Sequence, residues 1–212
     1  MPSIYKLKPL FQERLRPLVR GLAGAGVTAN QVTLLACALS IVVGTLLLAY
    51  KDLPRLLLIL PAFFFLRMAL NAIDGMLARE FGQKSDLGAY LNELTDVVSD
   101  AFLYLPFAYL GVFDPLWIGI IILLAVISEM AGTIGIMIGA TRRYDGPMGK
   151  SDRAFVFGAG ALWIGAGGTI ILPVVWVLPR LLAVLLIVTI VNRVRNGLAE
   201  KRAARASSMR PS

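Results

Sequence analysis

The sequence predicts an all-α integral membrane protein in which six transmembrane helices follow an amphipathic interfacial helix. Two observations lead to this fold class. The 212 residues are 58% hydrophobic and only 16% charged, whereas a soluble domain is about 45–50% apolar and about 25% charged. The apolar residues also occur in long stretches, and about 20 mostly apolar residues in a helix are enough to cross a bilayer.

The first 30 residues are expected to form the interfacial helix and a lead-in to the membrane domain. Between Ile4 and Leu22 basic residues alternate with apolar ones. This pattern is typical of a helix that lies on a membrane surface with its basic side against lipid headgroups, although a merely soluble leading helix is the alternative. Pro9 and Pro17 interrupt the segment and no apolar run is followed by small residues, so no cleavable signal peptide is expected.

The membrane domain is expected to cover 31–194, and a basic cytoplasmic tail 195–212. Thr28 is a plausible N-cap for the first span, and Pro54 starts or kinks the second. Pro173 and Pro179 divide the last two spans. The six spans are expected at 31–50, 53–77, 87–110, 115–140, 154–172 and 174–194.

Lysine and arginine residues are distributed unequally between the two sides of these spans. Seventeen of the 21 fall in the N-terminal segment, in the loops after spans two and four, and in the C-terminal tail, whereas the opposite side has only Lys51, Arg55 and Arg180. Cytoplasmic loops of membrane proteins are rich in Lys and Arg. We therefore expect an inner-membrane protein with both termini in the cytoplasm, and the net charge of +8 needs no nucleic-acid partner.

Six ionisable residues cluster in the second, third and fourth expected spans, where each costs at least about 2.5–3.5 kcal/mol on insertion scales and is a functional candidate. Residues three and four apart share a helix face, so Asn92, Asp96 and Asp100 form one polar ladder and Arg67, Asn71 and Asp74 another. A short loop joins the two helices, so the ladders can face each other. The six residues are Arg67, Asp74, Glu93, Asp96, Asp100 and Glu129.

The facing ladders predict a basin of carboxylates open to the cytoplasm. Carboxylate and amide oxygens suit a hard cation such as Mg²⁺ or Mn²⁺, and such a cation suits a pyrophosphate. The chain has no histidine and a single cysteine, Cys37, so metal or acid–base chemistry must use carboxylates. The alternative is a set of polar pairs that only hold the helices together.

The stretch from Asn71 to Asp96 resembles the signature of the CDP-alcohol phosphatidyltransferase family. That signature runs Asp-x2-Asp-Gly-x2-Ala-Arg, a spacer that is eight residues long here, and Gly-x3-Asp-x3-Asp. The segment 26–33 also looks like the family's lead into its first span. The spacing matches throughout, and six of the eight signature positions match in identity: Asp74, Gly75, Ala78, Arg79, Gly88 and Asp96.

The resemblance implies that the chain transfers a phosphatidyl group from CDP-diacylglycerol to a small alcohol and releases CMP. It implies that the signature acids hold two divalent ions at the CDP pyrophosphate. Gly75, Ala78 and Gly88 would make room for the nucleotide, and Arg79 would order the loop or the phosphates. Asp96 would be the general base, and the family also favours a homodimer.

The chain departs from this signature at its first and third acids, which are Asn71 and Asn92. The loss of two negative charges is expected to weaken the binding of two ions, and one ion is the alternative. Glu93 and Asp100 are candidates to serve as displaced ligands. A further hypothesis is that Arg67 pairs with Asp100 or Glu129 and replaces some of the cation charge.

Two further features are open to more than one interpretation. The loop 143–153 is basic and framed by glycine and proline. Its Arg143, Lys150 and Arg153 are candidates to bind the phosphate of a phosphorylated acceptor such as glycerol phosphate, or they are ordinary cytoplasmic charge. Gly135 and Gly139 permit close helix contact, either within the chain or at a dimer interface.

Two other functions remain open. The two asparagines are compatible with a catalytically impaired relative that binds CDP-lipid or lipid head groups. Arg67, Asp100 and Glu129 are compatible with the charge relay of a small transporter, although the sequence shows no clear internal repeat.

Overall fold

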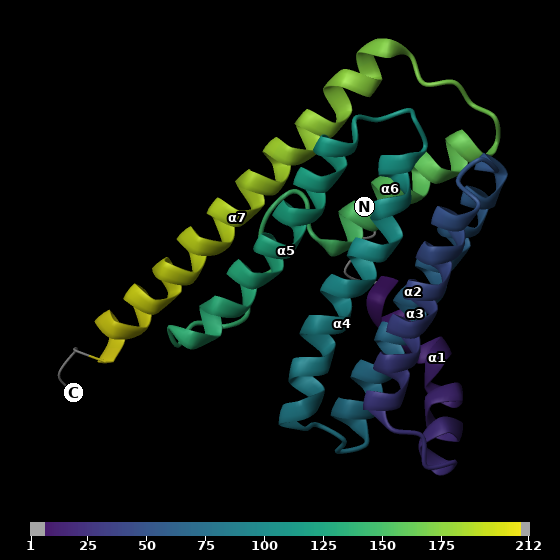
Figure 1. The fold of residues 1–212 in the computed structure, drawn as a ribbon. Coiled ribbons are helices and arrows are strands. Elements are labelled where there is room, and N and C mark those ends of the chain that lie inside the picture. The colour runs from purple at the N-terminus through teal and green to yellow at the C-terminus, as the bar shows by residue number, and fades with distance from the viewer. Residues whose placement is uncertain (1–6, 209–212) are drawn as a thin grey trace. The chain divides into compact units, whose positions relative to one another are not determined.

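A computed structural model describes residues 7–208 of the chain (Figure 1). The start of the expected interfacial helix, Ile4 to Lys6, and Arg210 in the expected tail lie outside these residues. The helices are α1 (Leu7–Gly24), α2 (Ala29–Ala49), η2 (Pro54–Leu58), α3 (Ile59–Glu80), α4 (Asp86–Tyr104), η3 (Leu105–Tyr109), α5 (Pro115–Met137), α6 (Lys150–Gly165) and α7 (Leu172–Ser208).

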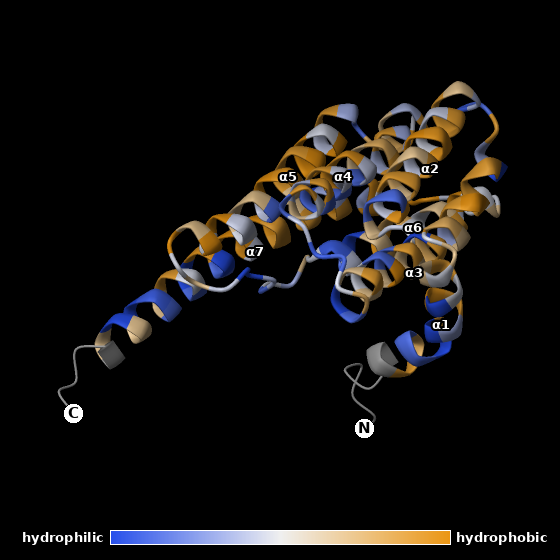
Figure 2. Ribbon diagram, turned by 90° about the horizontal axis from the view of Figure 1, so that it is seen from below, coloured by the Kyte–Doolittle hydropathy of each residue, from blue (hydrophilic) through white to orange (hydrophobic). Residues whose placement is uncertain are grey.

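Each of the six expected spans overlaps a helix, and four of these helices are long and apolar enough to cross a membrane. The four are α2, the segment Pro54–Glu80, α5 and the segment Leu172–Ala206 of α7. Helix α4 carries four carboxylates and α6 has only 16 residues, so a membrane crossing by these two stays a prediction. Apolar residues cover most of α2 and α5, whereas α1 mixes hydrophilic and apolar residues and the C-terminal part of α7 is largely hydrophilic (Figure 2).

The expected division between the last two spans is wrong. Helix α6 ends at Gly165 and α7 begins at Leu172, because the chain turns at Gly167, which has the positive φ of +85° that favours glycine. Pro173 lies in the first turn of α7, where no N–H is needed, and Pro179 lies inside the helix. The residues expected as a separate basic tail continue α7 as far as Ser208.

The chain divides into two compact units, of which unit 1 comprises 1–46 and 59–103. Here α1 packs against α3 around a core of buried apolar side chains. Part of the apolar side of α1 is therefore covered by protein, while Leu10 and Leu18 on the same helix are exposed. Arg16 and Glu80 form an ion pair between α1 and α3. The core consists of Val19, Ala29, Val32, Ile73, Met76 and Leu77.

Unit 2 comprises 47–58 and 104–212, and α5 and α7 lie side by side in it (Figure 1). The two helices run in the same direction, because Glu129 contacts Arg193 and the later Thr141, which follows α5, contacts Glu200. Helices that cross a bilayer in the same direction end on the same side, which agrees with the expected topology of spans four and six.

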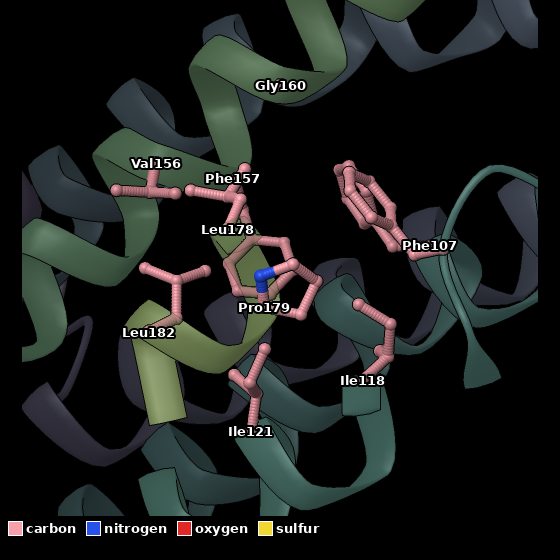
Figure 3. A pocket seen from close by; sticks show the side chains of 10 residues that line it. Phe107, Ile118, Ile121, Val156, Phe157, Gly160, Leu178, Pro179 and Leu182 are labelled. Atoms are coloured by element: carbon pink, nitrogen blue, oxygen red, sulfur yellow. The ribbon is translucent and has the colours of Figure 1, made fainter. Parts of the chain in front are cut away.

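A small apolar cavity lies among η3, α5, α6 and α7 in the same unit (Figure 3). Phe107, Phe157, Ile121 and Leu182 are among the side chains that line it. Its volume of ≈ 30 Å³ is small against the about 300–1,000 Å³ of a ligand pocket. Since the lining is apolar, the cavity is a gap in the packing and we assign no ligand to it.

Two glycines of α5 allow the loop that follows the helix to fold back onto it. A Cβ atom at Gly132 would lie 2.7 Å from the backbone oxygen of Arg143, and one at Gly135 would lie 3.0 Å from that of Thr141. Arg143 N–H also donates a hydrogen bond to the backbone oxygen of Gly132. Gly135 therefore serves packing within the chain, one of the two alternatives for this glycine.

We predict that Gly132→Ala lowers the thermal unfolding midpoint in detergent, because the new methyl group overlaps a backbone oxygen and overpacking costs about 1–3 kcal/mol. Gly119→Ala in the same helix is the matched control, since no atom lies within 4 Å of its Cβ position. It is expected to hold or slightly raise the midpoint through helix propensity. Equal effects of the two substitutions would contradict this account of the loop.

Candidate functional site

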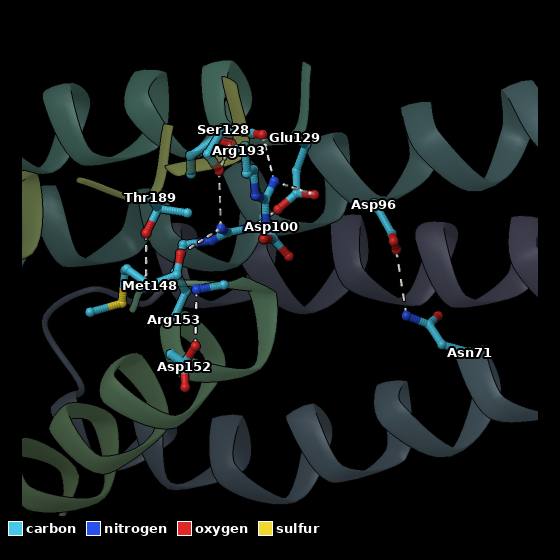
Figure 4. Close-up of polar contacts among 12 residues, drawn as sticks. Asn71, Asp96, Asp100, Ser128, Glu129, Met148, Asp152, Arg153, Thr189 and Arg193 are labelled. Carbon is cyan, nitrogen blue, oxygen red and sulfur yellow. Dashed lines mark hydrogen bonds and ion pairs between the residues drawn. The ribbon is translucent and has the colours of Figure 1, made fainter. Parts of the chain in front are cut away.

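Helices α3 and α4 form an antiparallel hairpin in unit 1, and the two polar ladders face each other across it. Gly82 has the positive φ of +68° at the turn after α3. Arg67 contacts Asp100. Asn71 Nδ2 donates to Asp96 Oδ1 at 3.5 Å (Figure 4). The spacing of four residues on each helix sets this register, since i and i+4 share a face.

Arg67 is the most buried member of the hairpin's polar set, with 3% of its surface exposed. Its Nη1 donates to Asp100 Oδ1 at 2.5 Å, and its Nη2 donates to the backbone oxygen of Asp96 at 3.1 Å and to Asp96 Oδ1 at 3.4 Å. The expected partnership of Arg67 with Asp100 or Glu129 is thus realised with Asp100. A guanidinium stays charged in proteins, so this contact keeps a permanent cation beside the two carboxylates.

Asp74 lies one turn after Asn71 on α3 and is held from α2. Its Oδ2 accepts a hydrogen bond of 2.7 Å from Thr33 Oγ1, and the residue is 5% exposed. The side chain of Gln83 ties the start of α2 to the turn after α3, because its Oε1 accepts from Ala29 N–H and its Nε2 donates to the Val27 oxygen. The position of Asp74 is therefore fixed by two helices.

The small signature residues lie close to polar side chains or to the core. A Cβ atom at Gly75 would lie 3.0 Å from the guanidinium of Arg79, so Arg79 lies over Gly75 on the outer side of α3. A Cβ atom at Gly88 would lie 2.8 Å from Asn30 Oδ1, and Ala78 packs against the core of unit 1. Space at these positions is limited by the chain itself.

The remaining metal-ligand candidates lie on α4, where Asn92 and Glu93 are half-buried. Within residues 7–208 no group of three or more His, Cys, Asp or Glu side chains is placed to hold a metal ion. The donors that the hairpin offers are carboxylate and amide oxygens, which fit Mg²⁺ or Mn²⁺.

A second buried charge cluster occupies unit 2, where three guanidinium groups surround Glu129 of α5. Figure 4 shows two of them, those of Arg153 and Arg193. Arg153 Nη2 donates to Glu129 Oε1 at 2.9 Å, and Arg193 Nη1 donates to Glu129 Oε2 at 3.2 Å. Nη2 of Arg142 lies 3.5 Å from Oε2 of Glu129. Arg153 and Arg193 are both fully buried, so α5, α6 and α7 are joined by charge at this point.

The other two candidates for binding an acceptor phosphate have different surroundings. Arg143 forms ion pairs with Asp145 and Glu200, both at 2.7 Å, and its hydrogen bond holds the pKa of Asp145 below the usual value. Lys150 is the half-buried first residue of α6. Of the three expected residues, only Arg153 is brought into the cluster around Glu129.

Sequence reasoning missed Thr33 and Arg193. Thr33 gives no signal of its own in an apolar helix, and its contact with Asp74 depends on how α2 lies against α3. Arg193 was counted as part of the cytoplasmic flank of the last span. A carboxylate in an apolar helix must have a cationic or hydrogen-bonding partner, so Glu129 was the signal that could have pointed to an arginine on another helix.

The chain is similar to several known proteins. Residues 26–191 match the sequence profile of the CDP-alcohol phosphatidyltransferase family. The chain is 43% identical over 201 residues to the inner membrane protein YnbA of Escherichia coli, covering 92% of this chain and 96% of that protein. It is also 30% identical to an archaetidylinositol phosphate synthase of Pyrococcus horikoshii, over 45% of this chain and 48% of that one.

Solved structures share the fold. The phosphatidylinositol phosphate synthase of Mycobacterium tuberculosis with CDP-DAG bound superposes with a TM-score of 0.69 at 23% identity, covering 85% of this chain and 92% of that one. The same enzyme in complex with manganese and citrate gives a TM-score of 0.70 at 23% identity, covering 86% of this chain and 88% of that one.

We predict that Glu129→Gln strongly destabilises the protein, because three guanidinium groups then lose their shared carboxylate. Removing one partner of a buried ion pair costs about 3–5 kcal/mol. Glu80→Gln is the matched control, since its ion pair with Arg16 is more than a third exposed on both sides and surface pairs contribute little. Thermal unfolding in detergent measures both, and an unchanged midpoint for Glu129→Gln would contradict the assignment.

Proposed function

Because the chain belongs to the CDP-alcohol phosphatidyltransferase family, we propose that it transfers a phosphatidyl group from CDP-diacylglycerol to a small phosphorylated alcohol. In this reaction the acceptor oxygen forms a bond to the phosphorus of the phosphatidyl group, the bond from that phosphorus to CMP breaks, and CMP leaves. The observation that carries the proposal is the α3–α4 hairpin, where Asn71 meets Asp96 and so aligns the two halves of the signature.

Asp96 is proposed as the general base. Its side chain is 21% exposed, so a substrate hydroxyl can reach it, and a base needs only to be within hydrogen-bond distance of the proton that it takes. Arg67 and Asn71 both donate to its Oδ1. These donors hold the carboxylate in one orientation.

Asp74, Asp96, Asn71 and Asn92 are the residues proposed to hold a divalent ion, with Glu93 as a further candidate. A bound Mg²⁺ or Mn²⁺ supplies positive charge at the phosphates of the nucleotide. Asp100 is assigned to the ion pair with Arg67. Gly75, Ala78, Arg79 and Gly88 are proposed to surround the nucleotide, with Arg79 positioned by its contact over Gly75.

A phosphorylated acceptor is supported by the arginines of unit 2. Guanidinium groups bind phosphate oxygens bidentately, and Arg142, Arg153 and Arg193 are gathered around Glu129. We propose Arg153 as a phosphate-binding residue, with Lys150 at the start of the same helix, α6. Arg143 is not proposed as a phosphate-binding residue, because it forms ion pairs with Asp145 and Glu200. The names of two relatives, which contain inositol phosphate, make that alcohol a candidate beside glycerol phosphate.

The protein is proposed to cross the inner membrane several times, as its apolar helices and its similarity to an inner membrane protein of Escherichia coli suggest. Both termini are proposed to lie in the cytoplasm, where the basic residues are concentrated. The helix α1 is proposed to lie at the membrane surface, and a homodimer remains part of the proposal.

A second candidate function is binding of CDP-lipid without catalysis. It is favoured by Asn71 and Asn92 and by the lack, among residues 7–208, of three acids grouped to hold a metal ion. The two candidates differ in whether CMP is released.

We predict that the purified protein releases CMP from CDP-diacylglycerol with Mg²⁺ or Mn²⁺ and one member of a panel of phosphorylated alcohols. Asp96→Asn should lower the rate by about 10²–10⁴-fold, the usual contribution of a general base. Asp52→Asn, at an exposed residue outside the signature, is the control and should keep the wild-type rate. Binding of CDP-diacylglycerol without CMP release for any acceptor would favour the second candidate instead.

A further inference from the structure

The carboxylates on the α4 side of the hairpin already have a cation of their own. Arg67 reaches both Asp96 and Asp100 from α3, and its burial keeps water from screening these contacts. Unlike a bound ion, this cation cannot dissociate or lose its charge. The inner end of the polar set is therefore neutralised by the protein itself.

One carboxylate oxygen of Asp96 is directed at nitrogen donors and is not placed to bind a second ion. Asp96 Oδ1 faces two nitrogen donors, Nη2 of Arg67 at 3.4 Å and Nδ2 of Asn71 at 3.5 Å. A carboxylate oxygen that accepts hydrogen bonds from nitrogen donors points at positive hydrogens, which a metal ion at that place would displace. Asn71 thus presents its amide nitrogen, rather than its oxygen, to Asp96.

The charge of the hairpin also suits one divalent ion. Two divalent ions about 3.5–4 Å apart repel each other, and each missing carboxylate leaves more of this repulsion uncompensated. Asn71 and Asn92 remove two negative charges relative to the family signature, and Arg67 adds a positive one. Arg67 already balances one of the negative charges of Asp74, Glu93, Asp96 and Asp100, so less charge remains for divalent ions to balance.

We propose that Arg67 takes the place of one of the two divalent ions, so that the chain binds a single ion with Asp74 among its ligands. This inference rests on the proposed function and deepens it. Arg67 is a positioning residue, because it acts by holding Asp96 and Asp100 and is not assigned a contact with substrate.

The experiment counts bound Mn²⁺ by electron paramagnetic resonance, with the full chain in detergent and CDP present. We expect one Mn²⁺ per wild-type chain. Asn71→Asp/Asn92→Asp should still bind one, because the guanidinium remains in place. Arg67→Met combined with these two substitutions restores the acids and removes the cation, so the count should rise to two. Arg67→Lys, which keeps the positive charge in the same double background, should return it to one.

Arg16→Met is the control, because it removes an arginine from an exposed ion pair elsewhere in unit 1 and should leave the count at one. Two ions bound to the wild type or to Asn71→Asp/Asn92→Asp would overturn the inference. If the triple variant with Arg67→Met does not fold, the ion count of this double variant alone decides the question. A count of one in a properly folded triple variant would also overturn it. Absence of Mn²⁺ binding together with absence of CMP release would instead refute the proposed function.

Discussion

The cost of placing charge among apolar helices constrains where this chain can build a polar site. Ionisable groups within a bilayer must be compensated by partners on other helices, and each unit of the protein meets this requirement in its own way. In unit 1 Arg67 compensates Asp96 and Asp100. In unit 2 Glu129 compensates Arg153 and Arg193. Because breaking either cluster would leave a buried charge alone, these ion pairs fix the helices that carry the candidate site.

This constraint explains why a short signature can define a site. The register of α3 against α4 follows from Arg67 meeting Asp100 and Asn71 meeting Asp96. The register also keeps Asp96 at the hairpin's exposed side while Asp100, one turn deeper, is buried. Asp96, which is exposed enough for a substrate to reach, and Asp100, which anchors the two helices, therefore lie one turn apart on the same face of α4.

The long apolar stretches were sufficient to predict the helices. Helical periodicity predicted the facing ladders, because residues four apart on two helices joined by a short loop have few ways to pair. It also narrowed the partner of Arg67 to two acids, of which the structure selects Asp100. It could not find Thr33 or Arg193, whose roles arise from packing between helices distant in sequence. The break before α7 was misplaced because proline was weighted above Gly167, and proline is tolerated in the first turn of a helix.

The most direct test of the account is an anomalous diffraction map of crystals grown with Mn²⁺ and CDP. The account predicts one anomalous peak per chain, in direct contact with the Asp74 carboxylate and with the nucleotide's phosphates, while Arg67 keeps its contacts with Asp96 and Asp100. A nucleotide bound without any peak at Asp74, or with Asp74 and Asp96 directed to opposite sides of the helix bundle, would contradict it.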